Sequence, residues 1–377
     1  MKNILKNLGL LAVSLAISLL LGEILVRLIA PQQLIVPSHD IWRPDETIGW
    51  RHRENANAQI NTGEGTVHFV SDENGYRINS IAEDEANAEP DISIITIGDS
   101  FLEAVQVENR FTIPQVIRRI LSNKYDKKVK VVNDGVGAWN PNHYLAEAKL
   151  ALAKGRYDLG IIFLYSANDI IIRKQTSFSS QVVSGKHHFR LPRSLKWREL
   201  INSIFYPIND LLEENSHLFL LLKNRTQALR ARVGLAADNY FPPVFKISEK
   251  KSKRWQLTTE ICEEIQQVFA RHMTPVFFVI LPAPFQINVD SFYESLDIYD
   301  IISDSVDIDQ PNTIMRDMFQ SESLHLEDPL MHMRKIAEEG RLMYGEVDGH
   351  FNAYGHEVVA EYIIDEIEEY LTPLLRQ

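Results

Sequence analysis

Two distant stretches of this sequence carry the residue types that nucleophilic catalysis needs. The tripeptide Gly98-Asp99-Ser100 follows the apolar run Ile92–Ile97, and Asp348-Gly349-His350 stands near the C-terminus. A serine hydroxyl becomes a nucleophile when a histidine removes its proton and a carboxylate holds that histidine in the right tautomer. Together the two stretches supply a nucleophile, a base and an orienting acid.

The turn at Ser100 also has a purely structural interpretation. Serine is a common helix N-cap, so Ser100 would simply cap the helix that follows. The turn is not the Gly-x-Ser-x-Gly elbow of α/β-hydrolases, because Leu102 occupies the position of the second glycine. Ligands of open parallel sheets bind at the carboxyl ends of strands, which is where Ser100 stands. The tripeptide alone leaves both interpretations open.

Two further loops follow apolar runs and carry groups that can bind a negative charge. Residues 133–139 read Asn-Asp-Gly-Val-Gly-Ala-Trp, and glycines allow backbone N–H groups to approach a ligand closely. Asn168, within Ser166–Asp169, has a side-chain amide able to donate to an oxyanion, a contact worth about 3–4 kcal/mol of barrier. The structural alternatives are a plain glycine turn and an Asn-Asp turn that ends a strand.

The apolar pattern predicts an α/β domain with a mainly parallel sheet. Short runs that are apolar on both faces are typical of strands covered by helices on both sides. They alternate with helical patterns, as in parallel α/β folds. The expected strands are Ile92–Ile97, Val129–Val132, Leu159–Tyr165 and Pro275–Leu281, and the expected helices include Ile113–Leu121, the stretch around Cys262 and Val359–Leu371.

Taken in chain order, four short blocks resemble those of the SGNH (GDSL-like) hydrolase superfamily, over about residues 90–370. They are Gly98–Ser100, residues 133–139, Asn168-Asp169 and Asp348-x-His350. The resemblance implies a flavodoxin-like three-layer α/β/α fold. It also implies Ser100 as nucleophile, His350 as general base and Asp348 as its orienting acid. An esterase or acyltransferase of this kind needs no metal or organic cofactor.

The same resemblance implies an oxyanion hole and a set of supporting positions. The hole consists of the Ser100 backbone N–H, the Ala138 backbone N–H and the Asn168 side chain. Three positions depart from the family pattern: Ala138 replaces a glycine, Ser166 replaces a common glycine, and Asp-x-His is one residue shorter than the commoner Asp-x-x-His. The supporting positions are Gly98, Asp99, Gly137 and Asp169.

The N-terminus predicts export and membrane attachment. An uncharged run, Asn7–Gly22, follows two lysines, and apolar character resumes after Glu23 with Arg27 as an interruption. A bilayer core needs roughly 20 apolar residues, so Glu23 and Arg27 must lie near the far interface, where they can pair at i, i+4 spacing. No small-x-small cleavage pattern is evident near Leu21–Ile29, which favours an uncleaved anchor over a signal peptide. Basic residues before the run place the main domain outside the cytoplasm.

The expected organisation is an anchor over 1–31, an extracytoplasmic strap over 32–90 and a hydrolase-like domain over 91–377. A basic helical insertion over about 176–254 carries the apolar run Leu211–Leu222. Residues 186–254 hold 14 Lys and Arg against 6 Asp and Glu, a balance of +8 in a chain of net charge −12. This insertion either attracts an anionic glycan or lipid headgroups, or is a solvated helical insert without a ligand.

The overall negative charge argues against nucleic acid as the main partner. The single cysteine, Cys262, excludes an intramolecular disulfide and fits the apolar stripe of a helix. The resemblance makes O-acetyl or other O-acyl groups on an envelope glycan or lipid the expected substrates. Two alternatives stay open: a non-catalytic glycan-binding or scaffold protein of an envelope assembly, and a lipase-like enzyme at the bilayer.

Overall fold

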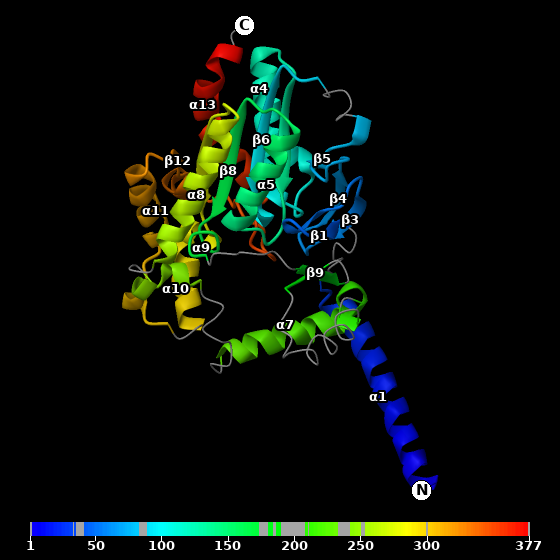
Figure 1. The fold of residues 1–377 in the computed structure, drawn as a ribbon. Helices are drawn as coiled ribbons and strands as arrows, with labels where there is room; N and C mark the ends of the chain where they lie inside the picture. The colour runs from blue at the N-terminus through cyan, green and yellow to red at the C-terminus, as the bar shows by residue number, and fades with distance from the viewer. Residues whose placement is uncertain are drawn as a thin grey trace. The chain divides into compact units, whose positions relative to one another are not determined.

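The computed structural model describes most of the chain (Figure 1). The described residues are 2–32, 34, 41–82, 89–172, 180–183, 186–189, 208–209, 211–232, 242–249, 253–298 and 301–375. Much of the predicted insertion over 176–254 therefore lies outside the described residues. The chain divides into two compact units, Met1–Pro37 with Leu191–Ala236, and Ser38–Arg190 with Ala237–Gln377.

A sheet of eight strands forms the centre of the larger unit. Its order is β12-β11-β8-β6-β7-β5-β4-β3, and the first five of these strands are parallel. Numbered along the chain, the parallel part has the order 2-1-3-4-5 of flavodoxin-like folds, so that expectation is confirmed. The parallel strands are β6 (Ile92–Gly98), β7 (Val129–Gly135), β8 (Leu159–Tyr165), β11 (Val276–Leu281) and β12 (Leu326–Glu327).

Helices cover both faces of this sheet, because alternate side chains of each buried strand point into two separate cores. On one face Ile95 and Ile97 pack with α5 (Pro141–Lys154), α8 (Arg254–Arg271) and α11 (Gln310–Ser321). Cys262 is buried in this core, as expected for a structural cysteine. The opposite face packs against α4 (Ile113–Tyr125), α12 (Leu330–Ala337) and α13 (Ala353–Leu375). The three-layer α/β/α prediction is therefore confirmed.

The segment expected to be an irregular strap is more regular than predicted. Three of its strands extend the sheet in antiparallel fashion beyond β7: β5 (Arg77–Ile78), β4 (Thr66–Ser71) and β3 (Asn57–Asn61). A separate hairpin joins β1 (Trp42–Asp45) to β2 (Gly49–His52). The strap, defined here as residues 41–82, is thus part of the same unit as the parallel sheet.

The smaller unit contains two described long helices. Helix α1 (Lys2–Ile29) includes a stretch, Lys6–Ile29, with a mean hydropathy of 2.3, long and apolar enough to cross a membrane. Helix α7 (His217–Arg232) follows residues 211–215, which are also helical. The run Leu211–Leu222, expected to lie in a helical insertion, is helical except at Ser216. The chain breaks at Ser216, whose hydroxyl accepts the Phe219 N–H and so begins a new helix.

Candidate active site

The turn after β6 presents Ser100 at the carboxyl end of the central parallel strand. The short helix α3 (Ser100–Glu103) begins here, and the Asp99 carboxylate caps it by accepting the Phe101 N–H at 2.9 Å. Asp99, rather than Ser100, is therefore the N-cap. The Ser100 hydroxyl is directed instead to His350, with Oγ 2.8 Å from Nε2.

Gly135 allows α3 to lie directly on the end of β7. A Cβ atom at this position would stand 2.2 Å from the Glu103 backbone nitrogen and 2.5 Å from the Leu102 carbonyl carbon. Both contacts are with backbone, so no side-chain rotation can relieve them. The glycine in the second block thus has a packing reason, which is to bring the nucleophile turn and the adjoining loop together.

His350 and Asp348 lie in the loop that precedes α13. The Nδ1 atom of His350 is 3.4 Å from Asp348 Oδ1, within ion-pair distance. Asp348 is itself held in place, because its Oδ1 accepts the His350 backbone N–H at 3.0 Å and its Oδ2 accepts from Gln106 Nε2 at 2.7 Å. The Phe101 ring lies 4.7 Å from the imidazole, centroid to centroid, and limits its movement.

The charges around this histidine favour its protonated form. Burial alone would lower the pKa of His350, but the neighbouring Asp348 carboxylate outweighs that effect and raises the pKa above 6.5. For Asp348 burial works in the opposite direction, yet contact with His350 and Gln106 keeps its pKa below 3.8. Asp99 differs, because burial raises its pKa to about 6. Asp348 is thus the carboxylate suited to stay ionised beside the imidazole.

The loop after β7 presents Ala138 with a backbone conformation usual for glycine. Its φ is 62°, in the left-handed region, where glycine is the residue with the least strain. The Val136 N–H donates to Gly98 O at 3.2 Å, and this bond ties the loop to the nucleophile turn. Among the described residues, no acceptor is found for the N–H groups of Ser100 or Ala138.

Asn168 and Asp169 end β8 in a turn with two distinct roles. Asp169 is buried, and its Oδ2 accepts the Tyr165 N–H at 2.9 Å and the Tyr144 hydroxyl at 2.7 Å. These bonds close the turn, as the structural alternative required. Asn168 is exposed, and its Nδ2 reaches Asp99 Oδ2 at 3.4 Å, so its amide lies beside the residue that precedes the nucleophile. Ser166, which replaces a glycine, is buried and donates to Gln286 Oε1 at 2.6 Å.

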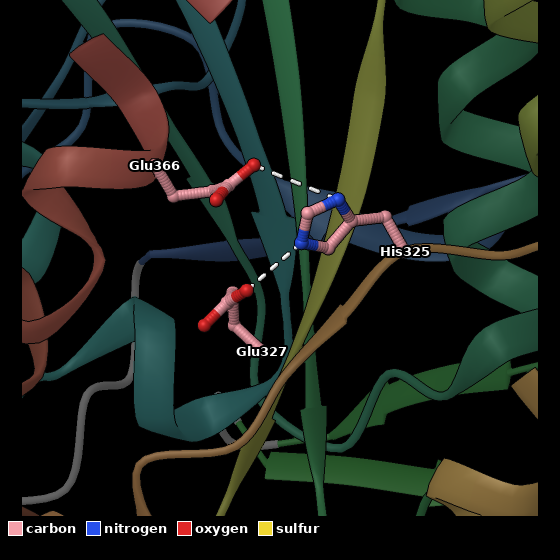
Figure 2. A group of neighbouring side chains, drawn as sticks. All are labelled: His325, Glu327 and Glu366. Atoms are coloured by element: carbon pink, nitrogen blue, oxygen red, sulfur yellow. Dashed lines mark hydrogen bonds and ion pairs between the residues drawn. The ribbon is translucent and has the colours of Figure 1, made fainter. Parts of the chain in front are cut away.

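A second polar cluster, which the sequence did not predict, gathers His325 directly before β12, Glu327 in β12 and Glu366 in α13 (Figure 2). Their ligand atoms all lie within 4.8 Å of one another, the spacing a metal ion needs. The two carboxylates, however, contact opposite nitrogens of the ring, Glu327 at Nε2 (2.8 Å) and Glu366 at Nδ1 (3.5 Å). The Tyr370 hydroxyl also lies 3.1 Å from Nδ1, so protein groups already contact both ring nitrogens and neither is left to face a metal ion.

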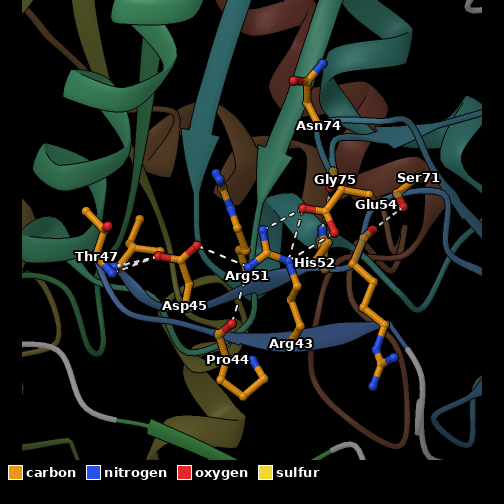
Figure 3. Close-up of polar contacts among 12 residues, drawn as sticks. Arg43, Pro44, Asp45, Thr47, Arg51, His52, Glu54, Ser71, Asn74 and Gly75 are labelled. Atoms are coloured by element: carbon orange, nitrogen blue, oxygen red, sulfur yellow. Dashed lines mark hydrogen bonds and ion pairs between the residues drawn. The ribbon is translucent and has the colours of Figure 1, made fainter.

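The strap supplies supporting residues that carried no sequence motif. His52, among the strap residues drawn in Figure 3, contacts Gly75 O through Nδ1 (3.2 Å) and Glu103 through Nε2 (2.7 Å). Through these two contacts His52 links the turn at Gly75 in the strap to Glu103 at the end of α3. Glu103 in turn accepts the Gly137 N–H, and contact with His52 keeps its pKa low despite complete burial.

Two tryptophans and a glutamate extend this support to the loop after β7 and to the loop of Asp348 and His350. The Trp50 indole N–H donates to Gly137 O, and the Trp139 indole N–H donates to Trp50 O, each at 2.9 Å. Glu64, in the turn between β3 and β4, accepts the Asp348 backbone N–H at 3.1 Å. Only the long-range packing of the strap reveals these contacts, since the residues are dispersed and of ordinary type.

Comparison with known proteins gives matches only among solved structures. No family model and no curated protein matches the chain. A member of the lipolytic protein G-D-S-L family from Veillonella parvula is 10% identical with a TM-score of 0.35, over 73% of this chain and 97% of that one. An acetyl xylan esterase is 11% identical with a TM-score of 0.41, over 73% and 100%. Another, from Geobacillus stearothermophilus, is 10% identical with a TM-score of 0.37, over 73% and 94%. Similarity this low carries no conclusion about activity, so the chemistry must come from the geometry of the site.

Proposed function

We propose that this chain is an SGNH-type serine esterase or acyltransferase that acts on O-acyl groups. Ser100 is the nucleophile, His350 the general base and Asp348 the acid that orients it. The backbone N–H groups of Ser100 and Ala138 and the side chain of Asn168 form the oxyanion hole. The site uses no metal or organic cofactor.

The observation that carries the proposal is the contact between Ser100 Oγ and His350 Nε2 at 2.8 Å. The two residues are 250 positions apart in the chain and come from opposite ends of the unit's sequence. A serine within hydrogen-bond reach of a histidine that a carboxylate faces is the arrangement nucleophilic catalysis requires. The carboxyl end of the central strand is also where open α/β sheets bind their ligands.

The reaction begins when Ser100 Oγ attacks the ester carbonyl carbon and His350 Nε2 takes its proton. Negative charge develops on the carbonyl oxygen, where the Ser100 and Ala138 amides can donate to it. Asn168 has two amide hydrogens, so one can remain on Asp99 while the other reaches the oxyanion. The intermediate collapses to an acyl-Ser100, and the leaving alcohol departs with the proton from His350.

The acyl-enzyme is then resolved by a second hydroxyl compound. Water, deprotonated by His350, gives hydrolysis, whereas a sugar hydroxyl gives acyl transfer. In either case the bond between the acyl group and Ser100 Oγ breaks, and His350 returns a proton to Ser100. The cycle therefore needs no reactant other than the acceptor. The strap and loops that exclude or admit water decide between the two outcomes.

The N-terminal helix supports a location outside the cytoplasm. Helix α1 is apolar enough to span a bilayer, and the lysines before it favour a cytoplasmic N-terminus. A membrane-attached, exported enzyme meets envelope glycans and lipids, and these are the proposed acyl carriers.

Turnover of p-nitrophenyl acetate by wild type and Ser100→Ala tests the proposal directly. We expect the substitution to lower kcat by about 10³-fold or more, because removing a triad member leaves only the oxyanion hole and binding. A fluorophosphonate probe should label Ser100 in the folded wild type and not in the variant. Equal turnover by both proteins would overturn the role of Ser100. A folded wild type that neither turns over esters nor takes the probe would point to a non-catalytic, glycan-binding protein.

A further inference from the structure

The helix α7 is attached to the last turns of α1 by a set of polar contacts. Glu23 of α1 accepts the backbone N–H groups of His217 (3.0 Å) and Leu218 (3.0 Å), the first two residues of α7. Its carboxylate also accepts the Ser216 hydroxyl at 2.7 Å. Ser216 in turn accepts the Phe219 N–H, so the first three N–H groups of α7 all have acceptors.

Arg27 and the chain beyond it complete this attachment. Arg27 pairs with Glu23 at 2.7 Å and donates to the Asn215 carbonyl, also at 2.7 Å. The Gln32 backbone N–H donates to His217 Nδ1 at 2.9 Å. The two charged residues that interrupt the apolar α1 therefore have a defined function: they bind the beginning of a second helix. A carboxylate at a helix N-terminus is also favoured by the helix dipole.

This attachment fixes the depth of α7 if α1 spans a bilayer. The stretch Lys6–Ile29 has 24 residues, about 36 Å of helix, against roughly 30 Å of hydrocarbon. Counted from Lys6, the hydrocarbon ends near Leu25, so Glu23 lies within about one turn of the far interface. Figure 1 shows α7 leaving the C-terminal end of α1 rather than running along it.

The composition of α7 suits the boundary between lipid and water. It opens with five consecutive apolar residues, Leu218–Leu222, and continues with four Lys or Arg and no Asp or Glu through residue 232. Leu222 and the nearby Leu211 are 55% and 61% exposed, so apolar surface lies next to the basic residues of this segment. Interfacial helices combine such apolar side chains with basic residues that face anionic headgroups.

We propose that α1 is retained as the membrane span and that α7 lies at the surface of the same bilayer. The exposed Leu222 enters the headgroup region together with Leu211, and the basic residues of α7 contact anionic lipid phosphates. An anionic glycan is the competing partner for the basic charge, but it gives no role to the exposed leucines or to the attachment at Glu23. The inference rests on the anchor part of the proposed function and not on the ester chemistry.

The experiment places an environment-sensitive fluorophore on Leu222→Cys in the full-length chain. The single natural cysteine, Cys262, is buried, and unlabelled wild type verifies that it does not react. The protein is reconstituted in phosphatidylcholine vesicles with about one third phosphatidylglycerol, and nitroxide lipids report depth. Leu15→Cys within α1 gives the lipid reference, and Met331→Cys, 64% exposed on α12, gives the comparison site in the larger unit.

We expect shallow nitroxide lipids to quench the label at position 222 at least about twofold more than the label at 331. Glu23→Ala should reduce this quenching by about half or more, since it removes the acceptor for two N–H groups. Glu23→Gln keeps a neutral acceptor and should retain more of the effect. The same measurements on a Ser100→Ala background separate this inference from catalysis, because no ester chemistry is needed.

Three results would overturn the inference. The first is quenching at 222 no greater than at 331. The second is protection of the 222 label from iodide by soluble dextran sulfate but not by anionic vesicles, which would assign the basic charge to a glycan. The third is an intact mass of the membrane-extracted protein that lacks α1, which would make this helix a cleaved signal.

Discussion

The tautomer of His350 determines which acid assists it. A general base must accept the serine proton at Nε2, so its hydrogen is on Nδ1, which faces Asp348 Oδ1 at 3.4 Å. Asp99 also lies near, but it is fully buried, caps α3 and accepts from Asn168. The Asp-x-His spacing therefore delivers a carboxylate to Nδ1 despite being one residue shorter than the commoner pattern.

Asp348→Asn should lower kcat by about 10²-fold or more with little change in KM, because the amide no longer holds the reactive tautomer. Asp348 is also the main cause that raises the pKa of His350. The base is active when neutral, so activity falls as pH drops through that pKa. In the variant this acidic limb should move to lower pH. A kcat loss below about fivefold, or an unmoved limb in a pH–rate profile, would assign the orienting role elsewhere.

Substitutions at Ala138 test whether activity depends on the backbone N–H or on the side chain at this position of the proposed oxyanion hole. Its φ of 62° costs a non-glycine residue about 1 kcal/mol, and a β-branched residue more. Ala138→Gly should therefore keep full activity and unfold at the same or a higher temperature. Ala138→Val should lose both stability and kcat. Thermal melts and p-nitrophenyl acetate kinetics on both variants check this, and a glycine variant with severely reduced kcat would contradict it.

The residues of the candidate site could be selected from the sequence, but the contacts that support them could not. Ser100, His350 and Asn168 each follow a recognisable strand or stand in a short motif, and topology brings strand ends together. Trp50 and Glu103 have no such signal, because their roles depend on how a distant segment packs. The N-cap also needed coordinates, since Asp99 and Ser100 are both good capping residues.

At the scale of elements, the strap contacts each loop of the candidate site instead of only covering it. Its strand β2 contributes Trp50 and His52 to the oxyanion loop, and its β3–β4 turn contributes Glu64 to the histidine loop. Arg77 of β5 is buried and donates to the Glu103, Ala104 and Val107 carbonyls, which close the C-terminal end of α3. The helix α3, the loop after β7 and the loop that carries Asp348 are thus all contacted by the same segment.

Trp50→Phe should lower kcat by about fivefold while KM stays within about twofold, since one hydrogen bond to Gly137 is worth about 1 kcal/mol. Hydrogen exchange in the peptide containing residues 134–140 should become faster. Trp255→Phe is the matched control, because Trp255 is equally buried but lies on α8. Equal effects of the two variants on kcat and on exchange would mean that Trp50 contributes only general stability.

The strands that sequence predicted and the strands it missed differ in their burial. β6 and β8 are buried on both faces and read as unbroken apolar runs. β3 is an edge strand with a largely polar sequence, Asn-Ala-Gln-Ile-Asn, and β12 has only two residues. Neither gives a periodic signal of useful length, which is why the sheet was predicted with fewer strands than it has.

At the scale of the whole molecule, buried carboxyl groups collect at the ends of the three central strands. Asp99 follows β6, Asp134 lies in β7 and Asp169 follows β8, and all three are buried. Burial raises the pKa of Asp99 to about 6, and it raises the pKa of Asp134 and of Asp169 well above 3.8. The charge of Asp99 adds to the effect at Asp169, and the charge of Glu147 adds to it at Asp134, so the folded protein holds protons that the unfolded chain releases.

The free energy of unfolding should therefore rise as pH falls through the folded pKa of each of these groups, which for Asp99 is about 6. A carboxyl group whose folded pKa is raised stabilises the fold below that pKa and loses the contribution as pH rises through it. His350, with its raised pKa, acts in the same direction. Buried His356, whose pKa is lowered to about 3, acts in the opposite direction, but only below its unfolded value of 6.5.

Urea unfolding at a series of pH values measures this slope, with Asp169→Asn as the diagnostic variant. Asparagine has nearly the same shape and no titration, so the variant should show a shallower dependence of stability on pH whatever its absolute stability. Asp304→Asn is the control, because Asp304 is an exposed carboxylate in the turn Ser303–Ser305 of the larger unit. It should leave the slope unchanged. An Asp169→Asn variant with the same pH slope as the wild type would mean that Asp169 is already ionised in the folded protein, with a counter-charge or solvent that the packing around the end of β8 does not provide.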